Sequence, residues 1–148
     1  MAILRYTASA DNTITNAFES NLVTRGTGSN MGFADSLEIF SIYGQESGSN
    51  GQSQELSRAI IQFPIDQIKR DRTAGTVPAS GSVAFYLRMF NAEHPFTLPQ
   101  NFTLVVAAVS QSWTEGTGLD MDNYSDITND STGSNWLRRN GPVSWTDP

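Results

Sequence analysis

Apolar residues recur at every second position in several parts of the chain, a pattern that predicts β-strands with one buried face. The clearest run covers residues 82–90, and its apolar face carries Val83, Phe85, Leu87 and Met89. Residues 102–110 are apolar on both faces, which predicts a strand covered on both sides at the centre of a sheet. Four further strands are predicted at residues 3–7, 13–18, 37–43 and 57–63.

Helical periodicity is confined to residues 65–70, which predict one or two turns between strands. The connections at residues 25–32 and 44–54 are rich in Gly, Ser and Asn, so we expect them outside the core. Many strands with little helix predict an all-β fold, a jelly-roll β-sandwich with long polar loops.

The length of 148 residues predicts one domain with its own core. We expect a single jelly-roll domain over residues 1–148. Its strand-rich body would cover residues 1–112, and residues 113–148 would form a loop region and the last strand. The alternation is weak in this last part, which nevertheless holds all three tryptophans: Trp113, Trp136 and Trp145.

Composition removes several kinds of chemistry. The chain has no cysteine, which excludes disulfides, thiolate nucleophiles and Cys-containing zinc sites, and its single histidine is His94. No spacing marks out a carboxylate pair or a nucleophile elbow. We therefore expect no catalytic residues and no cofactor. A polysaccharide-cleaving enzyme is the catalytic alternative, since the 15 acidic residues supply carboxyl groups.

Charge argues against two classes of partner. Nine basic and 15 acidic residues give a net charge of −6, and the basic residues are scattered, without a stripe that would follow phosphates. Neither a polybasic cluster nor an apolar run of about 20 residues is present. Binding to nucleic acid and insertion into a membrane are therefore not expected. The amino terminus does not match a signal peptide, which suits a virion component made in a cytoplasm.

An acidic tract supplies candidate ligands for a hard cation. Asp120, Asp122 and Asp126 would offer carboxylate oxygens to Ca²⁺. The bidentate glutamate of an EF-hand loop is missing from its expected place. We therefore expect a solvated acidic loop without metal, and a Ca²⁺ site is the alternative.

Aromatic side chains are the candidates for contact with a glycan or a protein partner. Trp113, Tyr124 and Trp136 lie among Asn, Gly and Asp residues, where rings can stack on sugars while polar neighbours bind hydroxyls. The alternative is that these rings belong to the core.

Several motifs occur in an order that resembles the DNRLRE-type domains, which are jelly-roll modules related to carbohydrate-binding modules. Residues 57–63 form a strand that ends in an aromatic residue, and residues 79–90 follow with a small-residue turn and an apolar strand. Next come the Trp-Thr-Glu-Gly segment at residues 113–116 and the Val-Ser-Trp segment at residues 143–145. The resemblance implies a non-catalytic binding or packing module. The opening residues and the Trp-Thr-Glu-Gly segment also look like structural proteins of marine tailed phages.

In the family, further strands follow the Val-x-Trp element, so we expect a roll that is completed by a further segment or by a neighbouring subunit. The predicted function is a structural module of a phage virion, as a capsid decoration, fibre or tail component. Its partners would be virion proteins, copies of itself and a host glycan. The alternative is a carbohydrate-binding module of a surface adhesin or polysaccharide-degrading enzyme, located outside the cell or on its surface.

Overall fold

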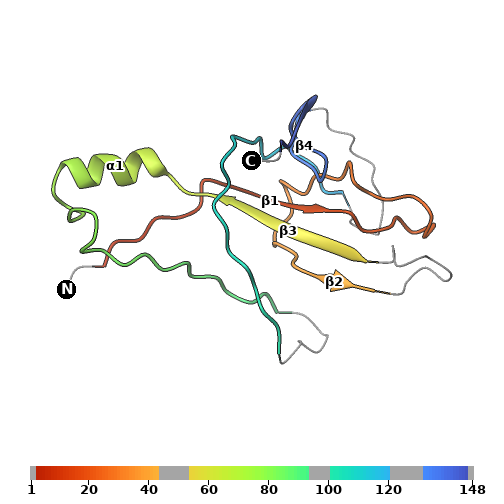
Figure 1. Ribbon diagram of the computed structural model, residues 1–148, viewed down its shortest axis with the longest axis horizontal. Coiled ribbons are helices and arrows are strands. Elements are labelled where there is room, and N and C mark those ends of the chain that lie inside the picture. The colour runs from red at the N-terminus through yellow and green to blue at the C-terminus, as the bar shows by residue number, and fades with distance from the viewer. Residues whose placement is uncertain (1–2, 44–53, 94–100, 121–131, 147–148) are drawn as a thin grey trace. The chain divides into compact units, whose positions relative to one another are not determined.

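The computed structural model describes residues 3–43, 54–93, 101–120 and 132–146 (Figure 1). Its elements in chain order are β1 (Ala10–Thr15), β2 (Ser41–Ile42), β3 (Glu55–Gln62), α1 (Ile65–Thr73), β4 (Arg138–Asn140) and β5 (Val143–Ser144). Among these described residues the regular structure is strands with one short helix, so the chain is a small all-β protein.

The chain forms two compact units. The helix unit comprises residues 1–7 and 63–108, and the sheet unit comprises residues 8–62 and 109–148. The tryptophan-containing end of the chain therefore belongs to the same unit as β1, β2 and β3.

The main sheet has the order β1-β3-β2, and both pairs are antiparallel. β3 is the strand predicted at residues 57–63; it begins at Glu55 and pairs with the whole of β1, from Ala10 opposite Gln62 to Thr15 opposite Ser57. The strand predicted at residues 13–18 is present as β1, shifted toward the amino terminus. The central strand is thus β3, whereas the sequence predicted residues 102–110 for that place.

β2 is shorter than the strand predicted at residues 37–43 because a side chain takes over part of the ladder. The Ser57 hydroxyl accepts a hydrogen bond from the Phe40 backbone N–H at 2.7 Å and donates to the Glu38 backbone oxygen at 2.8 Å. The Ser57 backbone N–H donates to the Phe40 backbone oxygen at 3.1 Å, and the paired residues of β2 begin at Ser41, which lies opposite Leu56.

The core of the sheet unit is largely polar. Its buried apolar side chains are few among the described residues: Ile14, Ala17, Phe18, Met31 and Ile60. The buried polar side chains of the same unit outnumber them: Asn12, Thr13, Thr15, Ser29, Asn30, Glu55, Ser57, Asp120, Ser134 and Asn135. Because a buried polar group is costly unless it is hydrogen-bonded, this core depends on specific polar contacts more than on apolar area.

The segment of residues 25–32 lies inside this core, and the prediction that it lies outside was wrong. Ser29, Asn30 and Met31 are each at most 4% exposed. A Gly-rich segment can be buried when side-chain amides make the hydrogen bonds that the nearby backbone groups need. The Asn30 side chain bonds in this way to the backbone of Glu115, Gly118 and Ser134.

Three predicted strands are absent. Residues 3–7, 82–90 and 102–110 contain no strand in the structure, and Figure 1 draws the last two as coil without arrows. Among the described residues no backbone hydrogen bond joins residues 83–93 or 101–110 to another segment. The alternating pattern requires a neighbouring strand before it becomes a ladder, and the described part of the chain provides none.

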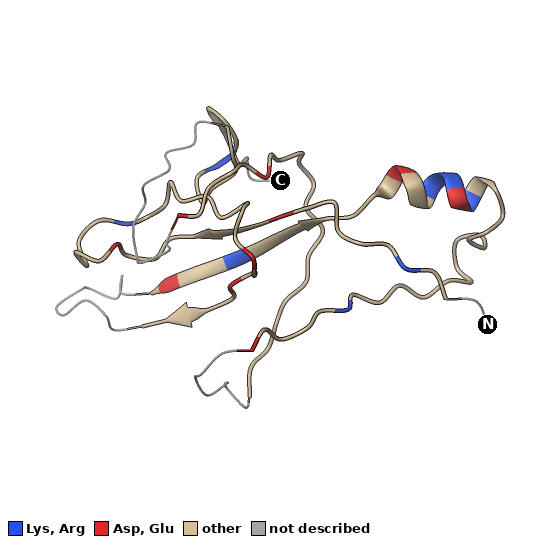
Figure 2. Cartoon of the chain, turned by 180° about the vertical axis from the view of Figure 1, so that it is seen from behind, with Lys and Arg blue, Asp and Glu red and all other residues tan. Residues whose placement is uncertain are grey.

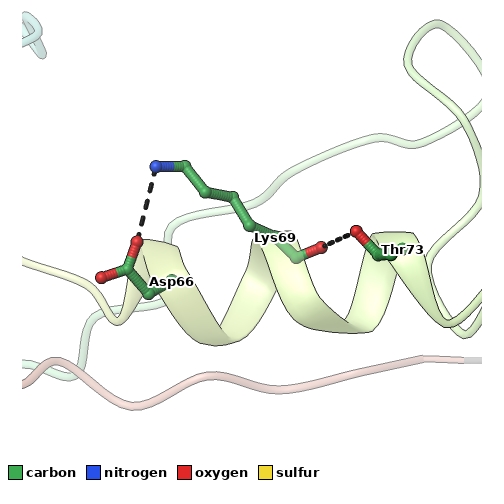
Figure 3. Close-up of polar contacts among 3 residues, drawn as sticks. All are labelled: Asp66, Lys69 and Thr73. Atoms are coloured by element: carbon green, nitrogen blue, oxygen red, sulfur yellow. Dashed lines mark hydrogen bonds and ion pairs between the residues drawn. The ribbon is translucent and has the colours of Figure 1, made fainter.

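α1 confirms the predicted helix and runs to Thr73, beyond residue 70. None of its residues is buried, and it is stabilised by contacts along its own surface. Figure 3 shows Lys69 Nζ at 3.4 Å from the Asp66 carboxylate and the Thr73 hydroxyl donating to the Lys69 backbone oxygen at 3.1 Å. Gly75, at φ +78°, follows the last turn in the left-handed conformation that favours glycine.

The segment after residue 131 folds into a small hairpin. β4 and β5 pair antiparallel, and Gly141 between them adopts φ +40°. The Asn135 side-chain oxygen accepts hydrogen bonds from the Leu137 and Arg138 backbone N–H groups, which forms the turn into β4. The Trp145 indole N–H donates to the Asn135 backbone oxygen at 2.8 Å, which links the residue after β5 to this turn.

Candidate interaction surface

Two segments of the helix unit expose apolar side chains in succession. Residues 83–90 and 102–108, which we call the apolar segments, contain four exposed aromatic side chains: Phe85 at 65%, Tyr86 at 88%, Phe90 at 79% and Phe102 at 65%. Their exposed aliphatic side chains are Leu87, Met89, Leu104, Val105 and Val106. Such a run of exposed apolar side chains is unusual, since exposed apolar residues are ordinarily scattered singly.

Charge is sparse on the apolar segments. Arg88 is the only charged residue within them, and its guanidinium lies 4.8 Å from the Phe90 ring centroid. Figure 2 shows the contrast with α1, where basic and acidic residues follow one another. Exposed edge strands usually carry charges or proline, which prevent pairing with another chain. The apolar segments contain one charge and no proline.

In the sheet unit, Asn30 joins three stretches of chain. Its side-chain N–H group donates to the backbone oxygens of Glu115 at 2.6 Å and Ser134 at 2.9 Å. Its side-chain oxygen accepts from the backbone N–H groups of Gly118 at 2.8 Å and Gly32 at 3.2 Å. All the hydrogen-bonding positions of this buried amide are therefore occupied.

Asn12 makes a second connection to the same place. Its side-chain N–H group donates to both the backbone oxygen and the hydroxyl of Ser134, each at 2.9 Å, and its oxygen accepts from the Met31 N–H at 2.9 Å. Neither Asn12 nor Asn30 was singled out from the sequence. The sequence offered one sign of their role, an Asn near Gly and Ser residues, but exposed loops have the same composition.

One of the candidate calcium ligands is a structural group. Asp120 is 2% exposed, and its carboxylate accepts the Asn30 backbone N–H at 3.2 Å. Asp122 and Asp126 lie outside the described residues. Within residues 3–43, 54–93, 101–120 and 132–146, no three His, Asp or Glu side chains gather where they could hold a metal ion.

The structure describes two of the three candidate aromatic contacts, and both are half-buried. Trp136 has the Arg58 guanidinium over its ring at 4.4 Å from the centroid, so one face of the indole is already occupied. Trp113 lies just before the Glu115 backbone that Asn30 binds. Tyr124 lies outside the described residues. Among the described residues the two most exposed aromatic rings, Tyr86 and Phe90, lie in the apolar segments, which the sequence predicted as strands.

A shallow hollow of about 320 Å³ lies beside the β4–β5 hairpin. Four of its five lining residues have polar side chains: Gln111, Ser112, Arg139 and Thr146, with Val143 as the fifth. Arg139 donates to the Ser112 backbone oxygen at 2.9 Å, and the Gln111 side chain donates to the Thr146 backbone oxygen at 2.7 Å. These groups have the chemistry to bind hydroxyls.

Two carboxyl groups of the sheet unit approach each other at the start of β1. The Asp11 backbone N–H donates to the Glu115 carboxylate at 2.8 Å. Burial, and then the negative charge of Glu115, raise the pKa of the Asp11 carboxyl above its usual value of 3.8. Ionisation of Asp11 is therefore less favourable in the folded chain than in the unfolded chain.

Comparison with known proteins found no match among family models, curated proteins or solved structures. Among the residues that the structure describes, no helix has the length and apolar character needed to span a membrane.

Proposed function

We propose that this chain is a non-catalytic structural module that works as part of a larger assembly. The observation that carries the proposal is the exposure of the apolar segments, whose backbone groups have no ladder partner in the described chain. Unpaired backbone groups beside large apolar side chains are a template for strand addition. A protein that works alone would need to cover them, whereas an assembly component uses them.

The proposal includes a finer description of the fold, a jelly-roll sandwich completed on assembly. Sheets of three and two strands make a small part of such a sandwich. The apolar segments carry the patterns of two further strands, alternating in residues 83–90 and apolar on both faces in residues 102–108, and pairing with a neighbouring subunit would give both a ladder and a cover. The motif order shared with DNRLRE-type domains supports this architecture.

We propose a phage virion as the assembly, with the chain as a capsid decoration, fibre or tail component. The resemblance to marine phage structural proteins supports this location. A surface with few charges also supports it, because only 16% of residues are charged, against about 25% in an average soluble domain. Packing against other subunits then removes few charges from water.

Mass measurement and hydrogen exchange test the proposal together. Purified full-length chain should form oligomers, or bind the other proteins of its particle, and amides of residues 83–90 and 102–108 should become protected only in the associated form. A chain that remains monomeric with these amides already protected, and that associates with no particle protein, would contradict the proposal.

A carbohydrate-binding module is the second candidate, and the hollow beside the β4–β5 hairpin favours it. Arg139, Gln111 and Thr146 would bind sugar hydroxyls there, and Trp113 follows the Ser112 that lines the hollow. A glycan array tests this function with Arg139→Ala and Trp113→Ala, using Trp113→Phe as the variant that keeps an aromatic ring. Retention of no glycan by the unmodified chain would exclude it.

A further inference from the structure

We propose that residues 83–90 pair antiparallel with the same residues of a second copy of this chain, about a two-fold axis at Tyr86. This inference rests on the proposed assembly function and names its first partner. A two-fold contact uses one surface twice, so the surface must be complementary to itself.

The exposed area of residues 83–90 favours such a contact. An aromatic side chain buries about 150 to 250 Å² when it is covered. Phe85, Tyr86 and Phe90 are 65 to 88% exposed, so they alone offer on the order of 450 Å² in each chain. A standard stable interface takes about 800 Å² from each partner, and the exposed Leu87 and Met89 of the same segment add to the aromatic area.

The charge distribution favours a copy of the same surface over a charged partner. Arg88 is the only charge in the apolar segments, so there is no charged pattern for an acidic or basic protein to recognise. An apolar strand is best covered by another apolar strand, and a second copy supplies one at equal concentration.

Sequence periodicity then selects the register. Side chains alternate between faces, so a shift of one residue would place the face of Val83, Phe85, Leu87 and Met89 beside the face of the other strand that carries Arg88. A shift of two residues would leave Val83 or Met89 opposite a residue outside the apolar face. When Tyr86 lies opposite Tyr86, Val83 lies opposite Met89 and Phe85 lies opposite Leu87. All the alternate apolar residues of both strands then share one continuous face.

The same register keeps the two Arg88 side chains apart. Arg88 lies opposite Ala84 of the partner, and the two Arg88 positions are about 13 Å apart along the strands. This distance exceeds the Debye length of about 8 Å at physiological salt, so their repulsion is screened. A register centred on Arg88 would place two like charges directly opposite each other, which is unfavourable.

A charge placed on the apolar face tests the contact. Native mass spectrometry of the full chain should detect a dimer, and Leu87→Glu should weaken it about 100-fold or more, because the two-fold axis puts the change into the interface twice. Val23→Glu is the matched control, since Val23 is 78% exposed in the sheet unit. Circular dichroism should show the same folded signal for both variants. Equal weakening by both would overturn the proposal.

Spin labels test the register, and the absence of native cysteine makes each label unique. Labels on Ala84→Cys and Arg88→Cys should give equal distances between copies, because both positions lie two residues from the axis. Labels on Ser82→Cys and Phe90→Cys should also give equal distances, longer than the first pair by about 13 Å. Unequal distances within either pair would overturn the register at Tyr86.

Hydrogen exchange separates failure of this inference from failure of the proposed function. Monomers with unprotected amides at residues 83–90, which gain protection only on a different particle protein, would overturn self-pairing and support assembly. Monomers with protected amides there that bind no particle protein would overturn both.

Discussion

The side-chain amide of Asn30 donates to the backbone oxygen of Ser134 at 2.9 Å, across 104 residues of sequence. The Asn12 amide donates to that same oxygen at 2.9 Å. The end of the chain is therefore joined to β1 and to the Gly-rich segment by buried amides. This arrangement explains how a unit with few buried apolar residues holds its loops in place.

Replacing Asn30 should be among the most damaging single changes. Asn30→Ala leaves the Glu115 oxygen and the N–H groups of Gly118 and Gly32 without the partner that Asn30 provides, and it removes one of the two amide donors to the Ser134 oxygen. We expect a loss of about 4 kcal/mol in the free energy of unfolding, because each buried unsatisfied group costs about 1 to 3 kcal/mol and water relieves part of this. Urea unfolding followed by circular dichroism measures it.

Asn21→Ala is the matched control for Asn30. The Asn21 side chain makes three hydrogen bonds, with the backbone N–H groups of Val23 and Thr24 and with the Thr24 hydroxyl, but it is exposed. Water can replace those bonds, so a loss of at most about 1 kcal/mol is expected. Similar losses for the two variants would mean that burial of Asn30 is unimportant.

Gly118 should not tolerate a side chain. A Cβ at this position would overlap the backbone oxygen of Asn30, although the backbone of Gly118 is not in the left-handed region. We expect Gly118→Ala to lower the unfolding free energy by about 3 kcal/mol, in the range of overpacked sites. Thermal unfolding measures the change. Gly75→Ala should lose only about 1 kcal/mol, because there a Cβ meets nothing within 4 Å and only the φ of +78° is unfavourable.

Asp11 should make the sheet unit more stable as the pH falls toward 4. Its pKa is raised in the folded chain by burial and by Glu115, so the folded state binds the proton more tightly than the unfolded state. The stability of the unmodified chain therefore decreases as pH rises through the interval above 3.8. Asp11→Asn should remove this contribution and should be more stable than the unmodified chain at pH 7. Urea midpoints at pH 4.5 and pH 7 for both proteins measure the effect. If the midpoint of the unmodified chain changed between the two pH values by as much as that of Asp11→Asn, the prediction would be contradicted.

Tyr6 should titrate above its usual pKa of 10.0. Its hydroxyl donates to the Asp71 carboxylate at 2.7 Å, and this hydrogen bond is the main cause of the raised pKa. The bond stabilises the helix unit below pH 10 and is lost as pH rises through the raised value. Absorbance at alkaline pH should show a late tyrosine step in the unmodified chain. Tyr6→Phe should remove that step, and Asp71→Asn should move it back toward pH 10.

The strand of residues 57–63 and the helix of residues 65–70 were predictable because their causes are local. Alternating apolar residues define β3, and Pro64 separates it from α1, whose polar side chains bond to one another along the helix. The shift of β1 and the shortening of β2 were not predictable. They depend on the Ser57 hydroxyl and on the Asn16 side-chain oxygen, which accepts the Leu56 N–H at 2.7 Å. A side chain that joins a ladder leaves no periodic signal.

By itself the sequence determined the β-rich character of the chain, the place of its helix and the apolar character of residues 83–90 and 102–108, since each follows from neighbouring residues. Only the tertiary structure decided that Asn12 and Asn30 are buried at the centre of the sheet unit, and that the most clearly alternating segment, residues 83–90, exposes its aromatic side chains. The physical reason is that burial depends on contacts between distant parts of the chain. An Asn among glycines can be exposed in a loop or buried with every hydrogen bond made, and only its neighbours in space distinguish these two states.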